Sequence, residues 1–120
     1  MTKDKILIFS ATYNEAENIK DFLTSIEELS LPLSILLIDD NSPDNTWKII
    51  QEYSKNKENI YLIIRNKKEG LDTAHKIAYE YSIKNNYDFL ITLDADMSHD
   101  PKVIPKFIDK LKTYAFVLGS

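Results

Sequence analysis

Short apolar runs alternate along the chain with segments whose apolar residues recur at helical spacing. Each run is four to six residues long and apolar almost throughout, which is typical of strands buried on both faces of a parallel sheet. The runs are KILIFS (5–10), SILLID (34–39), IYLII (60–64), FLITL (89–93) and AFVL (115–118). This pattern predicts an α/β fold.

Amphipathic helices are expected between successive strands. Asn14 and Glu17 form a helix-start signature before the first of them, and Ser42-Pro43 can start the second. The apolar stripes are Ile19, Phe22, Leu23 and Ile26; Trp47, Ile50 and Tyr53; Leu71, Ala74, Ile77, Ala78 and Tyr81; and Phe107, Ile108 and Leu111. We therefore expect one domain over residues 1–120, in the order β-α-β-α-β-α-β-α-β, with helices on both faces of a parallel sheet.

In open parallel sheets, ligands bind beyond the carboxyl ends of the strands. The segments that follow the first four predicted strands contain SATYNE, DDNSPDN, RNKKEGLDT and DADMSHD. Because strand ends of a parallel sheet meet at one edge, these segments should lie together, and all but RNKKEGLDT are distinctly acidic. This edge is the candidate functional site.

Composition narrows the class of partner. The chain has 120 residues, of which 43% are hydrophobic and 28% charged, and a net charge of −4. No basic stripe is present, so a nucleic acid is not expected as a partner. There is no cysteine, which excludes disulfides and thiolate metal sites. The N-terminal apolar run is short, so we expect a strand there and neither a signal peptide nor a membrane span.

Asp94 and Asp96 flank Ala95 just after the fourth predicted strand. Side chains two apart on a strand can point the same way, and two carboxylates at one point repel unless a cation lies between them. Mg²⁺ or Mn²⁺ bridging to a substrate diphosphate would suit this D-x-D pair. For the pair alone, the stronger interpretation is that both acids cap the turn that follows, near Ser98 and Pro101.

Other polar residues at this edge each allow two interpretations. Asp39 and Asp40 could accept hydrogen bonds from a ribose or a base, or this segment could serve helix capping through Ser42 or Asp44. Glu15 could accept from a base, or it could simply suit a first helical turn.

Aromatic and basic residues join the acids at this edge. Tyr13 could stack on a nucleobase. Arg65, Lys67 and Lys68 could bind phosphates, although an exposed basic turn is the stronger interpretation of any one of them. Joint placement at one edge strengthens the binding interpretation of all these residues.

Taken in order, ATYNEAENI, LLIDDNSPDNTW, KKEGLDTAH and LDADMSHDPKVIP resemble family 2 glycosyltransferases of the GT-A fold. Within that family they are most similar to dolichol-phosphate and other polyprenyl-phosphate mannose synthases. The resemblance implies a Rossmann-like, metal-dependent enzyme that moves mannose from GDP-mannose onto a polyprenyl or dolichyl phosphate with inversion. It also implies a cytoplasmic location, with the parent enzyme peripheral to or anchored at the membrane.

The resemblance also assigns site residues. The matching positions are Ala11, Tyr13 and Glu15 for guanosine, Ile38 and Asp40 for the base and ribose, Lys68 near the nucleotide, and Asp94, Ala95 and Asp96 for the sugar nucleotide. Asp94 and Asp96 are the predicted catalytic residues and metal ligands, with Mg²⁺ or Mn²⁺ as cofactor. A lipid phosphate is already anionic, so no strong general base is expected.

Some positions depart from the family pattern. Ala11 replaces a proline, and Asn41 and Asn45 replace glycines. Asparagine tolerates the left-handed conformation, so we expect both turns to survive. Asp72 also replaces a glycine, and its carboxylate could crowd the diphosphate of the donor.

The family's catalytic chain is roughly twice as long as these 120 residues. We therefore expect a shortened chain that holds the donor-binding part, whose activity alone stays open, with an unpaired sheet edge that could promote self-association. Three other readings stay open. They are a family 2 enzyme that uses UDP-glucose or another nucleotide sugar for surface polysaccharide, a non-catalytic nucleotide-binding module, and a response-regulator-like domain. The response-regulator-like domain is disfavoured, because this sequence lacks the lysine that such a domain would have after its fifth strand.

Overall fold

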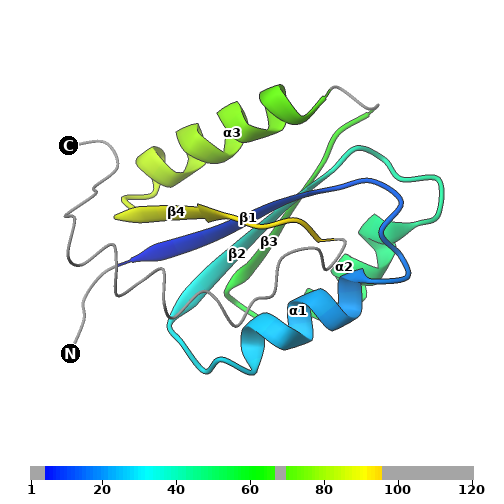
Figure 1. Ribbon diagram of the computed structural model, residues 1–120, viewed down its shortest axis with the longest axis horizontal. Helices are drawn as coiled ribbons and strands as arrows, with labels where there is room; N and C mark the ends of the chain where they lie inside the picture. The colour runs from blue at the N-terminus through cyan, green and yellow to red at the C-terminus, as the bar shows by residue number, and fades with distance from the viewer. Residues whose placement is uncertain (1–4, 67–69, 96–120) are drawn as a thin grey trace.

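The computed structural model describes residues 5–66 and 70–95 (Figure 1). Their elements, in chain order, are β1 (Ile6–Thr12), α1 (Ile19–Glu27), β2 (Leu33–Asp39), α2 (Thr46–Ser54), β3 (Ile60–Ile64), α3 (Leu71–Lys84) and β4 (Phe89–Thr92). The predicted α/β alternation is confirmed over these elements. The predicted strand 115–118 and the helix around 107–111 lie outside the described residues.

All strand pairs of the described sheet are parallel, and the strand order is β3-β2-β1-β4. Thr12 pairs with Asp39, and Asp39 pairs with Ile64, so β1, β2 and β3 end at the same level. The arrows in Figure 1 accordingly run in one direction. This register brings the segments that follow these strands to a common edge, as the sequence predicts.

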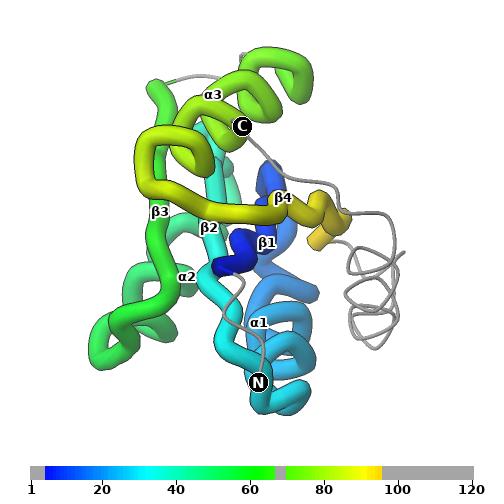
Figure 2. The backbone as a smooth tube through the Cα atoms, turned by 90° about the vertical axis from the view of Figure 1, so that its left-hand side faces the viewer, coloured from blue at the N-terminus to red at the C-terminus, as the bar shows by residue number. Residues whose placement is uncertain are grey.

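Helices cover both faces of the sheet. Ile6 and Ile8 of β1 belong to the core that includes the buried residues of α1, whereas Leu7 and Phe9 belong to the core under α3. Figure 2 shows α3 on one side of the sheet and α1 with α2 on the other. The alternation of strand side chains therefore fills two cores, which is why the central strands are apolar throughout.

The predicted helix starts are wrong by about one turn. α1 begins at Ile19 after Asn18, and α2 begins at Thr46 after Asn45. Asn14 instead adopts a left-handed conformation with φ of 56°. Ser42-Pro43 begins a turn in which the Asn45 N–H donates to the Ser42 carbonyl at 3.1 Å. The polar residues that mimic caps are used to shape the two loops before the helices.

The described sheet has β3 at one edge and β4 at the other. Tyr61 and Ile64 on β3 are exposed. Self-association through an unpaired edge stays a prediction.

Within residues 5–66 and 70–95, no helix combines the length and apolar character needed to cross a bilayer.

Candidate functional site

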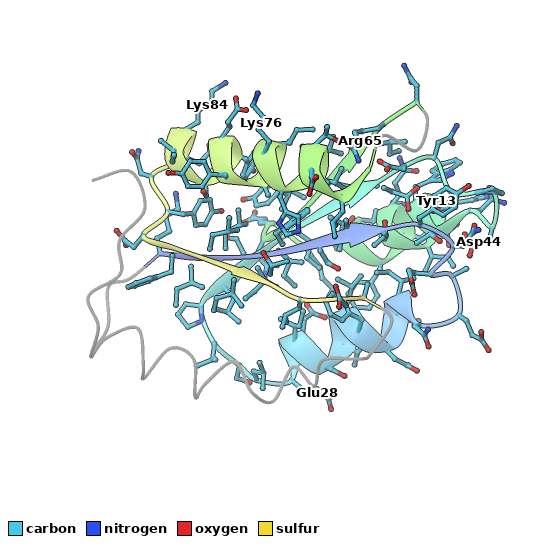
Figure 3. The ribbon with its side chains drawn as sticks, turned by 45° about the horizontal axis from the view of Figure 1, so that its top comes forward. Tyr13, Glu28, Asp44, Arg65, Lys76 and Lys84 are labelled. Atoms are coloured by element: carbon cyan, nitrogen blue, oxygen red, sulfur yellow. The ribbon has the colours of Figure 1, made fainter. Side chains whose placement is uncertain are left out.

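A cavity of about 200 Å³ opens at the carboxyl ends of β1 and β2. Its walls are Ala11, Thr12, Tyr13, Glu15, Asp40, Arg65, Gly70 and Leu71. Four predicted binding residues, Ala11, Tyr13, Glu15 and Asp40, therefore share one site. Figure 3 shows Tyr13 and Arg65 at the same end of the molecule. Pockets that hold a whole small molecule typically measure roughly 300–1,000 Å³. The described residues therefore enclose a cavity that could hold only part of such a ligand.

The sheet register explains why these residues meet. Tyr13, Asp40 and Arg65 each directly follow the last residue of a strand. The ladder continues through them, because the Asp40 N–H donates to the Thr12 carbonyl at 3.3 Å and the Arg65 N–H to the Asp39 carbonyl at 2.8 Å. One row across the sheet edge thus carries an aromatic ring, a carboxylate and a guanidinium.

Asp40 and Arg65 form a buried ion pair. Arg65 Nε donates to Asp40 Oδ1 at 2.5 Å, and Nη2 donates to Oδ2 at 2.8 Å. Each residue is only 8% exposed. The interpretation of Arg65 as part of an exposed basic turn is therefore wrong, because the guanidinium turns inward to neutralise Asp40. A bidentate pair of this kind fixes both side chains in the cavity wall.

Arg65 also connects Asp40 to the start of α3. Its Nη1 donates to Thr73 Oγ1 at 2.6 Å, and its Nη2 donates to the Gly70 carbonyl at 3.0 Å. Gly70 has a φ of 96°, which side-chain-bearing residues rarely adopt, so a glycine suits the turn into α3. The sequence suggests Arg65 as a phosphate ligand or an exposed cation, but not as the partner of Asp40. Its place directly after the third apolar run, at the level of Asp40, is the signal that identifies it.

Asp39 has a structural role distinct from that of Asp40. Its side chain is fully buried and accepts from Thr12 Oγ1 at 2.6 Å, from the Ser42 N–H at 2.8 Å and from Ser42 Oγ at 2.7 Å. These bonds join the end of β1 to the loop after β2. The predicted capping by Ser42 is therefore wrong, because Ser42 binds Asp39 within the loop. Of the two predicted caps, only Asp44 accepts from an N–H at the start of α2, that of Thr46.

Asp44 caps two segments at once. Its Oδ1 accepts from the Thr46 N–H at 3.1 Å and from Thr46 Oγ1 at 2.5 Å, and its Oδ2 accepts from the Ala16 N–H at 3.0 Å. Burial acts to raise the pKa of Asp44, but the hydrogen bonds from Thr46 and Ala16 outweigh it, so the pKa lies below the ordinary 3.8. The acid is thus held ionised as a structural acceptor.

The remaining predicted site residues lie elsewhere. Ile38 is fully buried in the core under α3, where it pairs with Ala11 in the sheet. Ala95 is buried in the other core. Lys68 and Asp96 lie outside the described residues. The structure therefore neither brings these residues to the cavity nor tests their predicted roles.

Asp94 is exposed and lies between two residues, Leu93 and Ala95, that are buried in the core containing α1. Phe9 pairs with Thr92, and the Leu93 N–H donates to the Phe9 carbonyl at 3.0 Å. Continued by two residues, this register puts position 94 at the level of Ala11 in the cavity wall. Among residues 5–66 and 70–95, no group of three or more His, Cys, Asp or Glu side chains could hold a metal ion.

Solved structures of similar fold include a mannosyltransferase. Mannosyltransferase PcManGT from Pyrobaculum calidifontis, in complex with GDP-Man and Mn²⁺, superposes with a TM-score of 0.71 at 22% identity, covering 80% of this chain and 28% of that chain. S. aureus TarS 1-349 in complex with UDP-GlcNAc gives 0.73 at 20% identity, covering 91% and 31%. These neighbours confirm the predicted GT-A fold.

Sequence comparison gives the family. The dolichol-phosphate mannosyltransferase of Pyrococcus furiosus is 36% identical over 110 residues, which are 90% of this chain and 30% of that protein. Several curated relatives are named as polyprenyl-phosphate mannosyltransferases, which confirms the resemblance to that subgroup. The chain spans about half, or less, of the length of these relatives. Because the profile named "Glycosyl transferase family 2" matches residues 7–120, nearly the whole sequence, the chain belongs to family 2 of the glycosyltransferases.

Proposed function

We propose that these residues are the donor-binding part of an enzyme that transfers mannose from GDP-mannose to a polyprenyl or dolichyl phosphate, with inversion. The observation that carries the proposal is the cavity, where Ala11, Tyr13, Glu15 and Asp40 meet at the carboxyl edge of a parallel sheet. Family membership makes the chain a glycosyltransferase. The names of relatives, and a neighbour that binds GDP-Man, favour mannose over other sugars.

The cavity suits the nucleoside rather than the whole donor. Tyr13 offers a ring on which a base can stack, and Glu15 offers acceptors for base or ribose donors. Asp40 lies in the same cavity wall, and its carboxylate oxygens are acceptors of the kind that ribose hydroxyls bind. Lys68 is proposed to lie near the phosphates, and Ile38 supports Ala11 from within the core.

Asp94 and Asp96 are proposed to hold Mg²⁺ or Mn²⁺. Asp94 fits this role because it is exposed at the end of β4, at the level of the cavity wall, and both residues supply the oxygen ligands that these ions prefer. When bound, the ion would neutralise the negative charge that develops on the departing nucleotide. Two carboxylates do not fill the coordination shell of such an ion, so phosphate oxygens of the donor would supply further ligands.

The acceptor and the location follow from the same proposal. A polyprenyl phosphate needs little activation as a nucleophile, so the residues mainly position the donor. The parent enzyme would act on the cytoplasmic side, peripheral to or anchored at a membrane. We propose that acceptor binding needs further chain, since the relatives are about twice as long or longer.

A second donor class has one observation in its favour. The fold also matches TarS, whose structure contains UDP-GlcNAc. A family 2 enzyme that uses a UDP-sugar for surface polysaccharide is therefore the competing proposal. A non-catalytic nucleotide-binding module would bind nucleotide without transferring sugar.

Isothermal titration of GDP and of UDP, with and without Mn²⁺, tests the proposal. The variants are Asp96→Ala and, as a matched control, Asp88→Ala, which removes an acid that binds the Lys5 N–H at 2.8 Å before β4 begins. Manganese-dependent binding of GDP that Asp96→Ala abolishes and Asp88→Ala retains would support the mannosyltransferase. A preference for UDP would favour the competing donor, and no binding of either nucleotide by the folded chain would reject a donor site in these residues.

A further inference from the structure

Three consecutive backbone N–H groups in the loop after β1 donate to side chains of a single segment, residues 42–46. The Asn14 N–H donates to Ser42 Oγ at 3.0 Å, the Glu15 N–H to Thr46 Oγ1 at 2.9 Å, and the Ala16 N–H to Asp44 Oδ2 at 3.0 Å. The acceptors of donors 14, 15 and 16 are thus residues 42, 46 and 44, in that order, and all three lie within five residues of one another. This loop-to-loop ladder joins two segments about thirty residues apart.

The acceptor side of the ladder is firmly anchored. Ser42 is 2% exposed and is held by Asp39, which is itself fully buried. Thr46 is fully buried in the first turn of α2. Asp44 is exposed, but both its carboxylate oxygens are used within the ladder. The segment 42–46 can therefore act as a rigid template.

The donor side carries the cavity residues. Tyr13 and Glu15 line the cavity, whereas Ser42, Asp44 and Thr46 do not. Asn14, between Tyr13 and Glu15, has a φ of 56°, a left-handed conformation that asparagine tolerates but does not prefer over the ordinary regions. The hydrogen bonds of the ladder select this conformation of the loop.

We propose that Ser42, Asp44 and Thr46 are positioning residues, which hold residues 13–16 in the conformation that receives the nucleoside. The part of this inference that concerns affinity rests on the proposed function. The three side chains touch no ligand and act through Tyr13 and Glu15. Without the ladder, the loop samples other conformations. The apparent dissociation constant of the nucleotide then equals the intrinsic constant divided by the fraction of protein molecules whose loop has the binding conformation.

Two variants test the ladder directly. Thr46→Val keeps the shape but removes the acceptor of the Glu15 N–H, and Thr46→Ser restores the hydroxyl. Asp44→Asn replaces one of the two carboxylate oxygens by an amide NH₂ group, which donates and does not accept. The variant therefore cannot accept from the Thr46 and Ala16 N–H groups through separate oxygens. Asp88→Asn is the matched control, because Asp88 also accepts a backbone N–H, that of Lys5, just ahead of β4 rather than in the ladder.

Amide hydrogen exchange, followed by NMR, reads out the loop without any ligand. We expect exchange at Glu15 to speed up about tenfold in Thr46→Val and to return to near wild type in Thr46→Ser. Exchange at Ala16 should rise similarly in Asp44→Asn, while Asp88→Asn leaves both amides unchanged. Wild-type exchange at Glu15 and Ala16 in the Thr46→Val and Asp44→Asn variants would overturn the proposal.

Nucleotide affinity separates this inference from the proposed function. Titration of GDP should show about tenfold weaker binding in Thr46→Val and Asp44→Asn, and unchanged binding in Thr46→Ser and Asp88→Asn. If the wild-type chain binds GDP and the two ladder variants bind equally well, positioning is refuted. If the wild-type chain binds no nucleotide, the proposed function fails, and the exchange experiment still decides whether the ladder fixes the loop.

Discussion

Replacing Arg65 by methionine should destabilise the protein far more than breaking an exposed ion pair does. The substitution keeps much of the side-chain volume but removes the guanidinium that binds both oxygens of Asp40. Asp40, which is 8% exposed, would then lose the guanidinium that binds both its oxygens. Removing one partner of a buried ion pair is costly in a poorly solvated site.

The expected magnitude follows from the burial of the two side chains, which are 7% and 10% exposed. Removing one partner of a buried pair costs about 3–5 kcal/mol. The bonds from Arg65 to Gly70 and Thr73 add little, because both residues are exposed and can bind water. Lys57 and Glu27 form the matched exposed pair, at 3.1 Å with 36% and 28% exposure. Lys57→Met should cost about 1 kcal/mol or less.

Urea unfolding of Arg65→Met, Lys57→Met, Asp40→Asn and the double variant Asp40→Asn/Arg65→Met measures these costs. The double variant should lose about 1–3 kcal/mol less free energy of unfolding than the two single variants lose together, because the two residues contact each other. The reasoning is refuted if Arg65→Met costs no more than Lys57→Met, or if the double-mutant cycle shows no coupling.

Three further predictions concern the loops around the cavity. Asn45 has a φ of 64°, so Asn45→Ala should lower the free energy of unfolding by about 1–2 kcal/mol while Asn45→Gly changes it little; equal urea midpoints for both variants would contradict this. The pKa of Asp44 is lowered in the folded state, so its contribution to stability is present above the unfolded value of 3.8 and is lost as the pH falls through the folded value. The loss of stability on acidification should therefore be shallower in Asp44→Asn, and identical pH profiles would argue against a folded-state shift. Asp72→Asn removes a negative charge from the first turn of α3, and calorimetry at low salt should show severalfold tighter GDP binding; unchanged affinity would mean that the Asp72 carboxylate does not crowd the diphosphate.

The apolar runs predict the strands well because a buried parallel strand leaves a direct trace in the sequence. Each described strand overlaps its predicted run, and the register then follows from the two-face packing of residues such as Leu7 and Ile8. The left-handed turns at Asn41 and Asn45 are confirmed as well, with φ of 53° and 64°. Both features depend on local sterics and burial, which a single sequence records.

The helix starts and the partner of Asp40 depend on contacts between distant segments, and a single sequence does not record those. Asn14 looks like a cap by composition, but its backbone N–H donates to Ser42, 28 residues away. Arg65 looks like a surface cation in RNKKEG, but its guanidinium binds Asp40, 25 residues away. Tertiary hydrogen bonds of this kind override local preferences at both positions.

The acids at and after the end of β2 already make contacts within the protein, and these contacts limit their use as metal ligands. Asp39 is used by Thr12 and Ser42, and Asp44 is used by Thr46 and Ala16. Asp40 is charge-compensated by Arg65, so it exerts little pull on a cation. A divalent ion is best held by carboxylates whose charge no neighbouring base offsets. The acidic character of the DDNSPDN segment therefore serves loop architecture through Asp39 and Asp44, and the proposed metal site at Asp94 and Asp96 does not draw on these acids.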